Sequence, residues 1–248
     1  MIIDAHIHLG RDYVFDEDFT EEELLKYYVE NNVYGAIVQP SISRPYMEDT
    51  IKIHDRIHKL CKKYPGKYWG MISINPHFRP EDYEKEAKRC VQELGFVGVK
   101  MTTIAHAVHP SKKDGMHVFE VAKALGIPVM IHTGAGTPFA DPVSIIPALE
   151  AFRDVKTVLA HSGTDLLAQQ ALYLAKTYEN VYLDTSWINI LNLQNFIKVL
   201  GPHKIMFASD HPINVPVELT KYRTAIHDPE ILNQVLAGTV IEVFNLKV

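Results

Sequence analysis

Cysteine is scarce in this sequence, which has only two cysteines, Cys61 and Cys90, among 248 residues. Disulfide frameworks and cysteine-based zinc sites need more thiols at characteristic spacings, so neither is expected here. Both cysteines fall in segments with a helical pattern. We interpret them as reduced thiols, which are typical of a cytoplasmic protein.

The sequence also lacks a long apolar run and an excess of basic charge. No segment approaches the roughly 20 apolar residues that a membrane-spanning helix needs. No signal peptide is expected, because the first predicted strand begins at Ile2 and carries Asp4 and His6 almost at once. The formal net charge is −5. Membranes and nucleic acids are therefore not expected as partners. The expected partner is a small-molecule substrate.

What the sequence does contain is a regular alternation of short apolar runs and longer amphipathic segments. Its hydrophobic fraction of 47% is that of an ordinary globular protein. Eight apolar runs, rich in valine, isoleucine and aromatic residues, are predicted to be parallel strands buried on both faces. They are Ile2–Ile7, Gly35–Val38, Tyr68–Ile74, Val97–Met101, Pro128–Ile131, Lys156–Ala160, Asn180–Leu183 and Lys204–Ala208.

The segments between these runs carry helix signals, such as the capping box formed by Thr20 and Glu23. Eight strand–helix units without a linker predict one domain, residues 1–248, folded as a single α/β (β/α)8 TIM barrel. The alternative is a doubly wound open sheet. It would need a glycine-rich phosphate-binding pattern, which Gly134 and Gly136 do not complete.

Chemically versatile side chains occur where the predicted strands end. The carboxyl ends of the strands form the active-site face of a barrel, so these side chains should converge. Alternation along the first strand also turns its two histidines to the same side. The residues are His6, His8, Lys100, His132, His161 and Asp210.

Taken singly, each of these residues has an ordinary structural explanation. A histidine at a strand end is usually just hydrogen-bonded, and an aspartate before a loop often caps a turn. Their joint placement at one end of different strands favours a common site. Three histidines and one aspartate suit a divalent cation with open positions for water or substrate. We therefore predict that His6, His8, His132 and Asp210 bind a metal ion.

The strand-end motifs fall in six segments. They are Ile3–His8, Gly95–Lys100, Ile127–Gly134, Val158–Gly163, Asn180–Ser186 and Phe207–Pro212. Together they resemble the amidohydrolase superfamily, and more narrowly its amidohydrolase-2 branch. That branch includes aminocarboxymuconate-semialdehyde decarboxylase, resorcylate-type decarboxylases and lactone hydrolases. Ala237–Phe244 looks like the closing helix of the family, with Thr239 where asparagine is usual.

The resemblance implies a role for each matching residue. His6, His8, His132 and Asp210 match the ligand positions. The expected cofactor is one divalent ion per chain, Zn²⁺ by default, with Mn²⁺, Fe²⁺ or Co²⁺ as alternatives. His161 and Asp210 match the groups that move protons beside a metal-activated water, so they are the predicted catalytic residues.

Lys100 has two interpretations. In binuclear amidohydrolases a lysine of this strand is carbamylated and bridges two metals, with His161 joining the second. In many amidohydrolase-2 members the lysine lacks that role. An unmodified ammonium is repelled by a cation, so Lys100 would then contact a substrate anion.

Loops after the strands should carry substrate specificity. We predict Arg44, Arg79, His106 and Trp187 as candidate substrate contacts, with an arginine able to clamp a carboxylate. Each could equally be a solvated loop residue. His54 and His58 lie four residues apart on a predicted helix without a zinc-protease pattern, and we expect both at the surface.

Three functions are compatible with these features. The leading hypothesis is a metal-dependent hydrolase of an ester, lactone or amide of a small, anionic metabolite. The second is a non-oxidative decarboxylase, a lyase, of an aromatic or muconate-like acid. The compact chain favours hydrolysis, since decarboxylases of this group tend to be longer. The third is a non-catalytic metal-binding barrel. The sequence leaves the oligomeric state open, with a homodimer as one alternative by analogy with relatives, which are often dimers.

Overall fold

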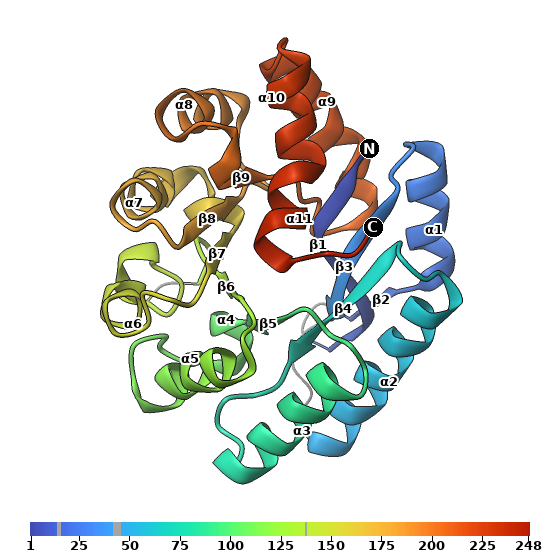
Figure 1. Cartoon of the computed structure of the whole chain (residues 1–248), viewed down its shortest axis with the longest axis vertical. Helices are drawn as coiled ribbons and strands as arrows, with labels where there is room; N and C mark the ends of the chain where they lie inside the picture. Colours follow the sequence, from blue (N-terminus) through green and yellow to red (C-terminus); the bar gives the residue numbers. More distant parts are fainter. Residues whose placement is uncertain (14–15, 42–45, 137) are drawn as a thin grey trace.

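The computed structural model describes residues 1–13, 16–41, 46–136 and 138–248. Its strands form one curled sheet in the order β2-β1-β3-β4-β5-β6-β7-β8-β9, with the helices outside it (Figure 1). Apart from β2, which pairs antiparallel with β1, neighbouring strands in this order are parallel. The strands are β1 (Ile3–Asp12), β2 (Glu17–Phe19), β3 (Gly35–Pro40), β4 (Tyr68–Ser73), β5 (Gly98–Met101), β6 (Val129–His132), β7 (Thr157–Ala160), β8 (Val181–Asp184) and β9 (Ile205–Met206).

The two ends of the parallel sheet meet, so the sheet closes into a barrel. The amide of Ala5 donates to the carbonyl of Phe207 over 3.0 Å, and the amide of Asp210 donates to the carbonyl of His6 over 2.8 Å. Ile7 and Asp210 also form a parallel bridge. Eight parallel strands in chain order, joined first to last, make a TIM barrel. The fold predicted from the sequence is confirmed.

Helices follow the strands and cover the outside of the barrel (Figure 1). Among the described residues, none is both long enough and apolar enough to cross a membrane. They are α1 (Glu21–Glu30), α2 (Met47–Lys63), α3 (Pro80–Gln92), α4 (Thr103–His106), α5 (Lys113–Leu125), α6 (Ile146–Ala151), α7 (Thr164–Thr177), α8 (Ile190–Leu200), α9 (Val215–Ala225), α10 (Pro229–Asn233) and α11 (Thr239–Phe244).

The predicted helix signals act as expected at α1. The Thr20 hydroxyl accepts a hydrogen bond from the Glu23 amide at 3.2 Å, which satisfies one of the amides left free at a helix start. Leu24 and Tyr28, one turn apart, then bury the inner face of this helix.

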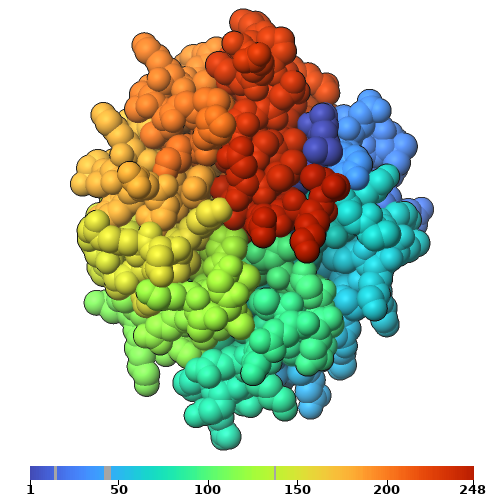
Figure 2. Space-filling model, viewed as in Figure 1, coloured from blue at the N-terminus to red at the C-terminus, as the bar shows by residue number. Residues whose placement is uncertain are grey.

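The barrel has an apolar core of its own, separate from the layer between strands and helices. Side chains such as Ile37, Met130 and Val158 from different strands pack together with Val240 and Phe244 of α11. Helix α11 thereby covers the end of the barrel where the strands begin (Figure 1). In the space-filling view, the side chains of the last helices occupy the centre of this face (Figure 2).

Strand β1 changes the direction of its side chains part-way. Its register against β3 shifts between Asp4 and Ile7, which marks a β-bulge. Before the bulge, Ile3 packs inside the barrel; after it, Ile7 packs in the outer layer. Strand alternation then directs His6 and His8 into the barrel. The bulge therefore aims both histidines at the barrel axis.

Asp4 stabilises both the bulge and the barrel closure. Its buried carboxylate accepts hydrogen bonds from the amides of His6 and Ser209, each at 3.0 Å. It also accepts from the hydroxyls of Tyr28 and Ser209. Burial raises the pKa of Asp4 to about 6, although the hydrogen bonds from Ser209, His6 and Tyr28 lower it. One side chain thus joins the first strand, the last strand end and α1.

The structure also contains a strand that the apolar pattern did not predict. Strand β1 continues to Asp12, and its last residues pair antiparallel with β2, where Gly10 faces Phe19. This hairpin lies at the carboxyl end of β1 and brings Phe19 to the mouth of the barrel.

Replacing Asp4 by alanine should destabilise the fold by about 2–4 kcal/mol, because two buried amides lose their acceptor. Chemical denaturation followed by circular dichroism measures this free energy. Asp154→Ala is the matched control, since Asp154 is 60% exposed and its carboxylate pairs with Lys123 at the surface. Equal stability of the two variants would show that Asp4 does not stabilise the closure.

Candidate metal centre

Three predicted ligands converge on one point at the barrel mouth. His6 Nε2 lies 3.1 Å from His8 Nε2 and 3.0 Å from Asp210 Oδ1, and His8 Nε2 lies 3.2 Å from the same oxygen. Metal bonds of about 2.0–2.2 Å place neighbouring ligand atoms roughly 2.9–3.5 Å apart. The three atoms are therefore spaced as the corners of a coordination polyhedron, and they fit a divalent cation.

The other edges of these rings are anchored in the protein. His6 Nδ1 donates to Asp184 Oδ2 over 2.6 Å, and His8 Nδ1 donates to the carbonyl of Pro40 over 2.9 Å. With Nδ1 protonated, each ring presents an unprotonated Nε2, which is the form that binds a metal ion. Asp184 is itself fully buried, and the hydrogen bond from His6 stabilises its ionised form.

Asp210 is held with one oxygen toward the histidines and the other toward Trp187. The indole Nε1 donates to Asp210 Oδ2 over 2.8 Å. Burial favours a raised pKa for Asp210, yet the neighbouring imidazoles, His6 and His8 among them, keep the pKa of Asp210 well below its usual value. The side chain is thus a carboxylate with Oδ1 available as a ligand.

Lys100 enters the same group from β5. Its Nζ lies 3.0 Å from His6 Nε2, and the residue is only 2% exposed. Burial lowers the pKa of Lys100 to about 8, against the charges of Asp210 and Asp184, which raise it. The amine therefore reaches the place where a ligand or a substrate anion would be held, which is compatible with both predicted roles.

His161, at the end of β7, stands beside the three converging residues. Its ring centre is 5.1 Å from that of His6, and its Nδ1 is 2.8 Å from the Ser186 hydroxyl oxygen. Burial lowers its pKa well below the usual value. The neutral ring lines the mouth cavity, so its Nε2 side is suited to accept a proton there.

His132 lies at the same mouth but is oriented differently. Its ring centre is 5.0 Å from that of His161, while its Nε2 donates to the carbonyl of Ala135 over 2.8 Å. Burial and the charge of Lys100 lower its pKa to about 4. The structure therefore brings together His6, His8 and Asp210 as a ligand group, with His132 in the cavity wall beside them.

A cavity of about 200 Å³ opens above these residues. Besides the strand-end residues, the loops and the β1–β2 hairpin form most of the cavity wall. The pattern of apolar runs in the sequence did not predict where these segments lie. The lining residues are His8, Asp12, Glu17, Phe19, Ser41, Lys100, Thr102, Ile104, His132, His161, Trp187, Asp210 and His211.

The predicted substrate contacts have different outcomes. Trp187 lines the cavity and is 49% exposed. Arg79 is exposed at the start of α3, and His106 is buried in α4; neither lines this cavity. Arg44 lies outside the described residues. A loop position in sequence fixes the face of the barrel but not the direction of a side chain.

The expectation that His54 lies at the surface was wrong. The ring is fully buried; its Nδ1 donates to Glu86 over 2.8 Å, and its Nε2 accepts from the Ser73 amide at 3.1 Å. Glu86 is also bound by Arg89. With both ring nitrogens occupied, His54 joins α2, α3 and β4 as a structural residue. His58 is partly buried and bonds to the carbonyl of Leu94.

The strand ends around the mouth hold strained backbone. His161, Trp187 and Asp210 have φ of 62°, 64° and 66°. A left-handed conformation of a non-glycine residue costs roughly 1–3 kcal/mol and tends to occur at functional sites. Each of these residues directs its side chain into the cavity wall.

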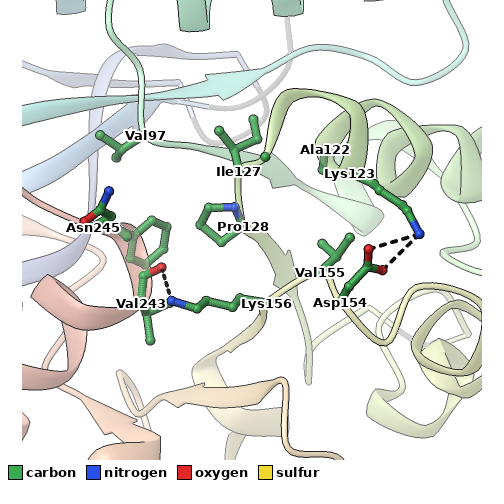
Figure 3. A pocket seen from close by; sticks show the side chains of 12 residues that line it. Val97, Ala122, Lys123, Ile127, Pro128, Asp154, Val155, Lys156, Val243 and Asn245 are labelled. Atoms are coloured by element: carbon green, nitrogen blue, oxygen red, sulfur yellow. Dashed lines mark hydrogen bonds and ion pairs between the residues drawn. The ribbon is translucent and has the colours of Figure 1, made fainter.

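A larger cavity of about 460 Å³ lies at the opposite end of the barrel, where the strands begin (Figure 3). Its lysines are occupied: Lys156 donates to the carbonyls of Glu242 and Val243, and Lys123 pairs with Asp154. Its lining contains no imidazole. Barrel active sites form at the other end, so the smaller cavity is the candidate site.

Solved structures with this fold include several decarboxylases. 5-Carboxyvanillate decarboxylase LigW from Sphingomonas paucimobilis has a TM-score of 0.76 at 17% identity, covering 99% of each chain. 2,6-Dihydroxybenzoate decarboxylase from Rhizobium has 0.79 at 15%, covering 99% of this chain and 98% of that one. LigW2 from Novosphingobium aromaticivorans, crystallised with manganese, has 0.78 at 14%, covering 99% and 97%. At such identities the likeness shows the fold.

A sequence profile described as amidohydrolase matches residues 3–246, which is nearly the whole chain. The match spans the first strand, with its two histidines, and the end of the last strand, with Asp210. The chain therefore belongs to the amidohydrolase family of metal-dependent TIM-barrel enzymes.

Proposed function

We propose that this protein is a metal-dependent decarboxylase of a small aromatic or conjugated carboxylic acid. The observation that carries this proposal is the composition of the mouth cavity. An aromatic wall meets a group of histidines and a lysine in a space of about 200 Å³. A cavity of that size favours a compact substrate of roughly one ring.

The aromatic wall is continuous with the ligand group. The ring centre of Phe19 is 6.1 Å from that of His8 and 5.0 Å from that of His211. Trp187 adds its indole and is bound to Asp210. A substrate ring packed on these side chains would direct its carboxylate toward Lys100 and the ligand group.

The metal site of this proposal consists of His6, His8 and Asp210, joined by His132 when a cation is bound. The cation would supply positive charge against which a carboxylate and a developing negative charge are stabilised. Zn²⁺ is our default; the manganese in LigW2 supports Mn²⁺ as an alternative.

Decarboxylation requires a proton at the carbon that loses the carboxylate. The carbon–carbon bond breaks as CO2 leaves, and its electron pair ends in the new carbon–hydrogen bond. We assign the proton movements to two of the acid–base residues that line the cavity, His161 and Asp210. Neither holds a proton to give at the start, so His161 would first take one from a substrate hydroxyl or from water and then deliver it to the carbon, with Asp210 assisting the transfer. The oxygen that lost the proton would regain one from solvent. Lys100 would hold the substrate carboxylate, and Trp187 would keep Asp210 in place.

The decarboxylase structures support this choice over the hydrolase that the sequence favoured. The matches cover 97–99% of those chains, so a compact chain gives no ground for preferring hydrolysis. Hydrolysis remains the second candidate. The observation in its favour is the position of His161, whose ring lines the cavity and can offer an unprotonated nitrogen to a water molecule there.

The proposed site should bind one metal ion per chain, and replacing a ligand should weaken that binding. The wild-type protein should bind one Zn²⁺ or Mn²⁺ per chain in isothermal titration calorimetry. His8→Ala and Asp210→Ala should each weaken binding by about 100-fold or more, because each removes a ligand. His203→Ala is the control, since its side chain is 68% exposed. Two equivalents per chain, with the second lost in Lys100→Ala, would instead indicate a binuclear site.

The reaction is tested with a panel of substrates on the metal-loaded protein. Hydroxybenzoates such as 2,6-dihydroxybenzoate should release CO2, detected by mass spectrometry, and a chelator should abolish the release. Lactones and esters should show no turnover. Hydrolysis of a lactone or ester without CO2 release from any acid would overturn the decarboxylase proposal in favour of the second candidate.

A further inference from the structure

We propose that Asp184, acting partly through Ser186, fixes the tautomers of two histidines at once, His6 and His161. It would thereby hold one ring as a metal ligand and the other as a proton acceptor. The roles of the two rings rest on the proposed function, whereas the hydrogen bonds that carry the inference exist in the protein without metal or substrate. Neither Asp184 nor Ser186 was predicted as a site residue from the sequence.

Asp184 ends β8 inside the barrel and is fully buried. Its two carboxylate oxygens serve different partners. Oδ2 lies 2.6 Å from His6 Nδ1, whereas Oδ1 accepts from both the amide and the hydroxyl of Ser186, at 2.9 and 2.8 Å. The two ring nitrogens of His6 and His161 are thus connected to one carboxylate.

The direction of each hydrogen bond follows from what each atom can donate. Asp184 Oδ1 accepts from the amide of Ser186, which can only donate, and Asp184 Oδ2 lies 2.6 Å from a ring nitrogen of His6, so the carboxylate acts as an acceptor toward both partners. His6 must therefore carry its proton on Nδ1. The Ser186 hydroxyl gives its single proton to Asp184. It can then only accept from His161 Nδ1, at 2.8 Å.

Both rings consequently carry a proton on Nδ1 and direct Nε2 away from the Asp184 network. For His6, Nε2 faces His8, Asp210 and Lys100. For His161, it lies on the side of the cavity that the ring lines. Orientation of a metal-bound histidine by a carboxylate is worth about 10–100-fold in metal affinity.

His132 provides an internal contrast. Its Nε2 is 2.8 Å from the carbonyl of Ala135, and a carbonyl only accepts, so Nε2 carries the proton. Asp184 and Ser186 do not contact this ring. Two tautomers therefore coexist at one mouth, each set by the acceptor that the ring meets. The acceptor is the Ala135 carbonyl for His132, the Pro40 carbonyl for His8, and the Asp184 network for His6 and His161.

The tautomers are measured directly by nitrogen-15 NMR of the histidine rings in the metal-free protein. His6 and His161 should show a protonated Nδ1, and His132 a protonated Nε2. Ser186→Ala should leave His6 unchanged and make His161 populate both tautomers. Ser186→Thr retains a hydroxyl and should restore the single form. Ser162→Ala is the matched control, because that buried hydroxyl binds the backbone carbonyl of Asp184 instead.

Metal binding separates the two branches of the network. Asp184→Asn should weaken Zn²⁺ binding about 10–100-fold, since His6 loses its charged partner. Ser186→Ala should change Zn²⁺ affinity by less than about threefold, while lowering kcat more than KM changes if His161 moves a proton.

The inference would be overturned by a protonated Nε2 on wild-type His161, or by an unchanged His161 spectrum in Ser186→Ala. It would also be overturned by wild-type Zn²⁺ affinity in Asp184→Asn. None of these readings uses a substrate. If the spectra and affinities agree but no acid is decarboxylated, the network stands and only the proposed reaction fails.

Discussion

The site depends on the hydrogen bonds that Asp4 makes inside the first strand. By accepting from the amide of His6, its carboxylate stabilises the bulge that turns His6 and His8 from the outer layer into the barrel. By accepting from the amide of Ser209, it fixes the last strand end beside the first. These two contacts therefore help to hold the histidines and Asp210 at the same end of the closed barrel.

The barrel is rigidly packed where its strands begin, and its backbone is strained where the strands end. The inner core and α11 hold the strand starts, while His161, Trp187 and Asp210 adopt left-handed backbone at the other end. Such conformations persist only where the surrounding structure imposes them. The two ends of the barrel thus have different roles. The packed end, where the strands begin, stabilises the fold, and the end where the strands finish presents imidazole rings and carboxylates to the cavity.

The fold and the location of the site could be predicted from the sequence because both follow from short-range patterns. Apolar runs bounded by helix signals locate strands, and barrel geometry then places every strand end on one face. His6, His8 and Asp210 were found in this way. The direction of His132 was not, because it depends on a loop carbonyl at Ala135.

Other features lay beyond the reach of sequence patterns for identifiable physical reasons. Strand β2 has only three residues, of which two are exposed, so it has no apolar signature. Asp184 and Ser186 resemble ordinary strand-end polar residues until the fold brings them to His6 and His161, which lie far away in the chain. His54 was predicted at the surface because a polar residue on a helix is usually exposed. Only the fold shows that Glu86 and Ser73 lie beside it and satisfy the buried ring.

One divalent ion should bind where His6, His8 and Asp210 converge. Anomalous diffraction from crystals grown with Mn²⁺ would locate that ion. We expect one strong peak per chain, about 2.0–2.2 Å from His6 Nε2, His8 Nε2 and Asp210 Oδ1. A peak elsewhere, such as between His54, Glu86 and Cys90, or a second peak bridged by a modified Lys100, would contradict this expectation.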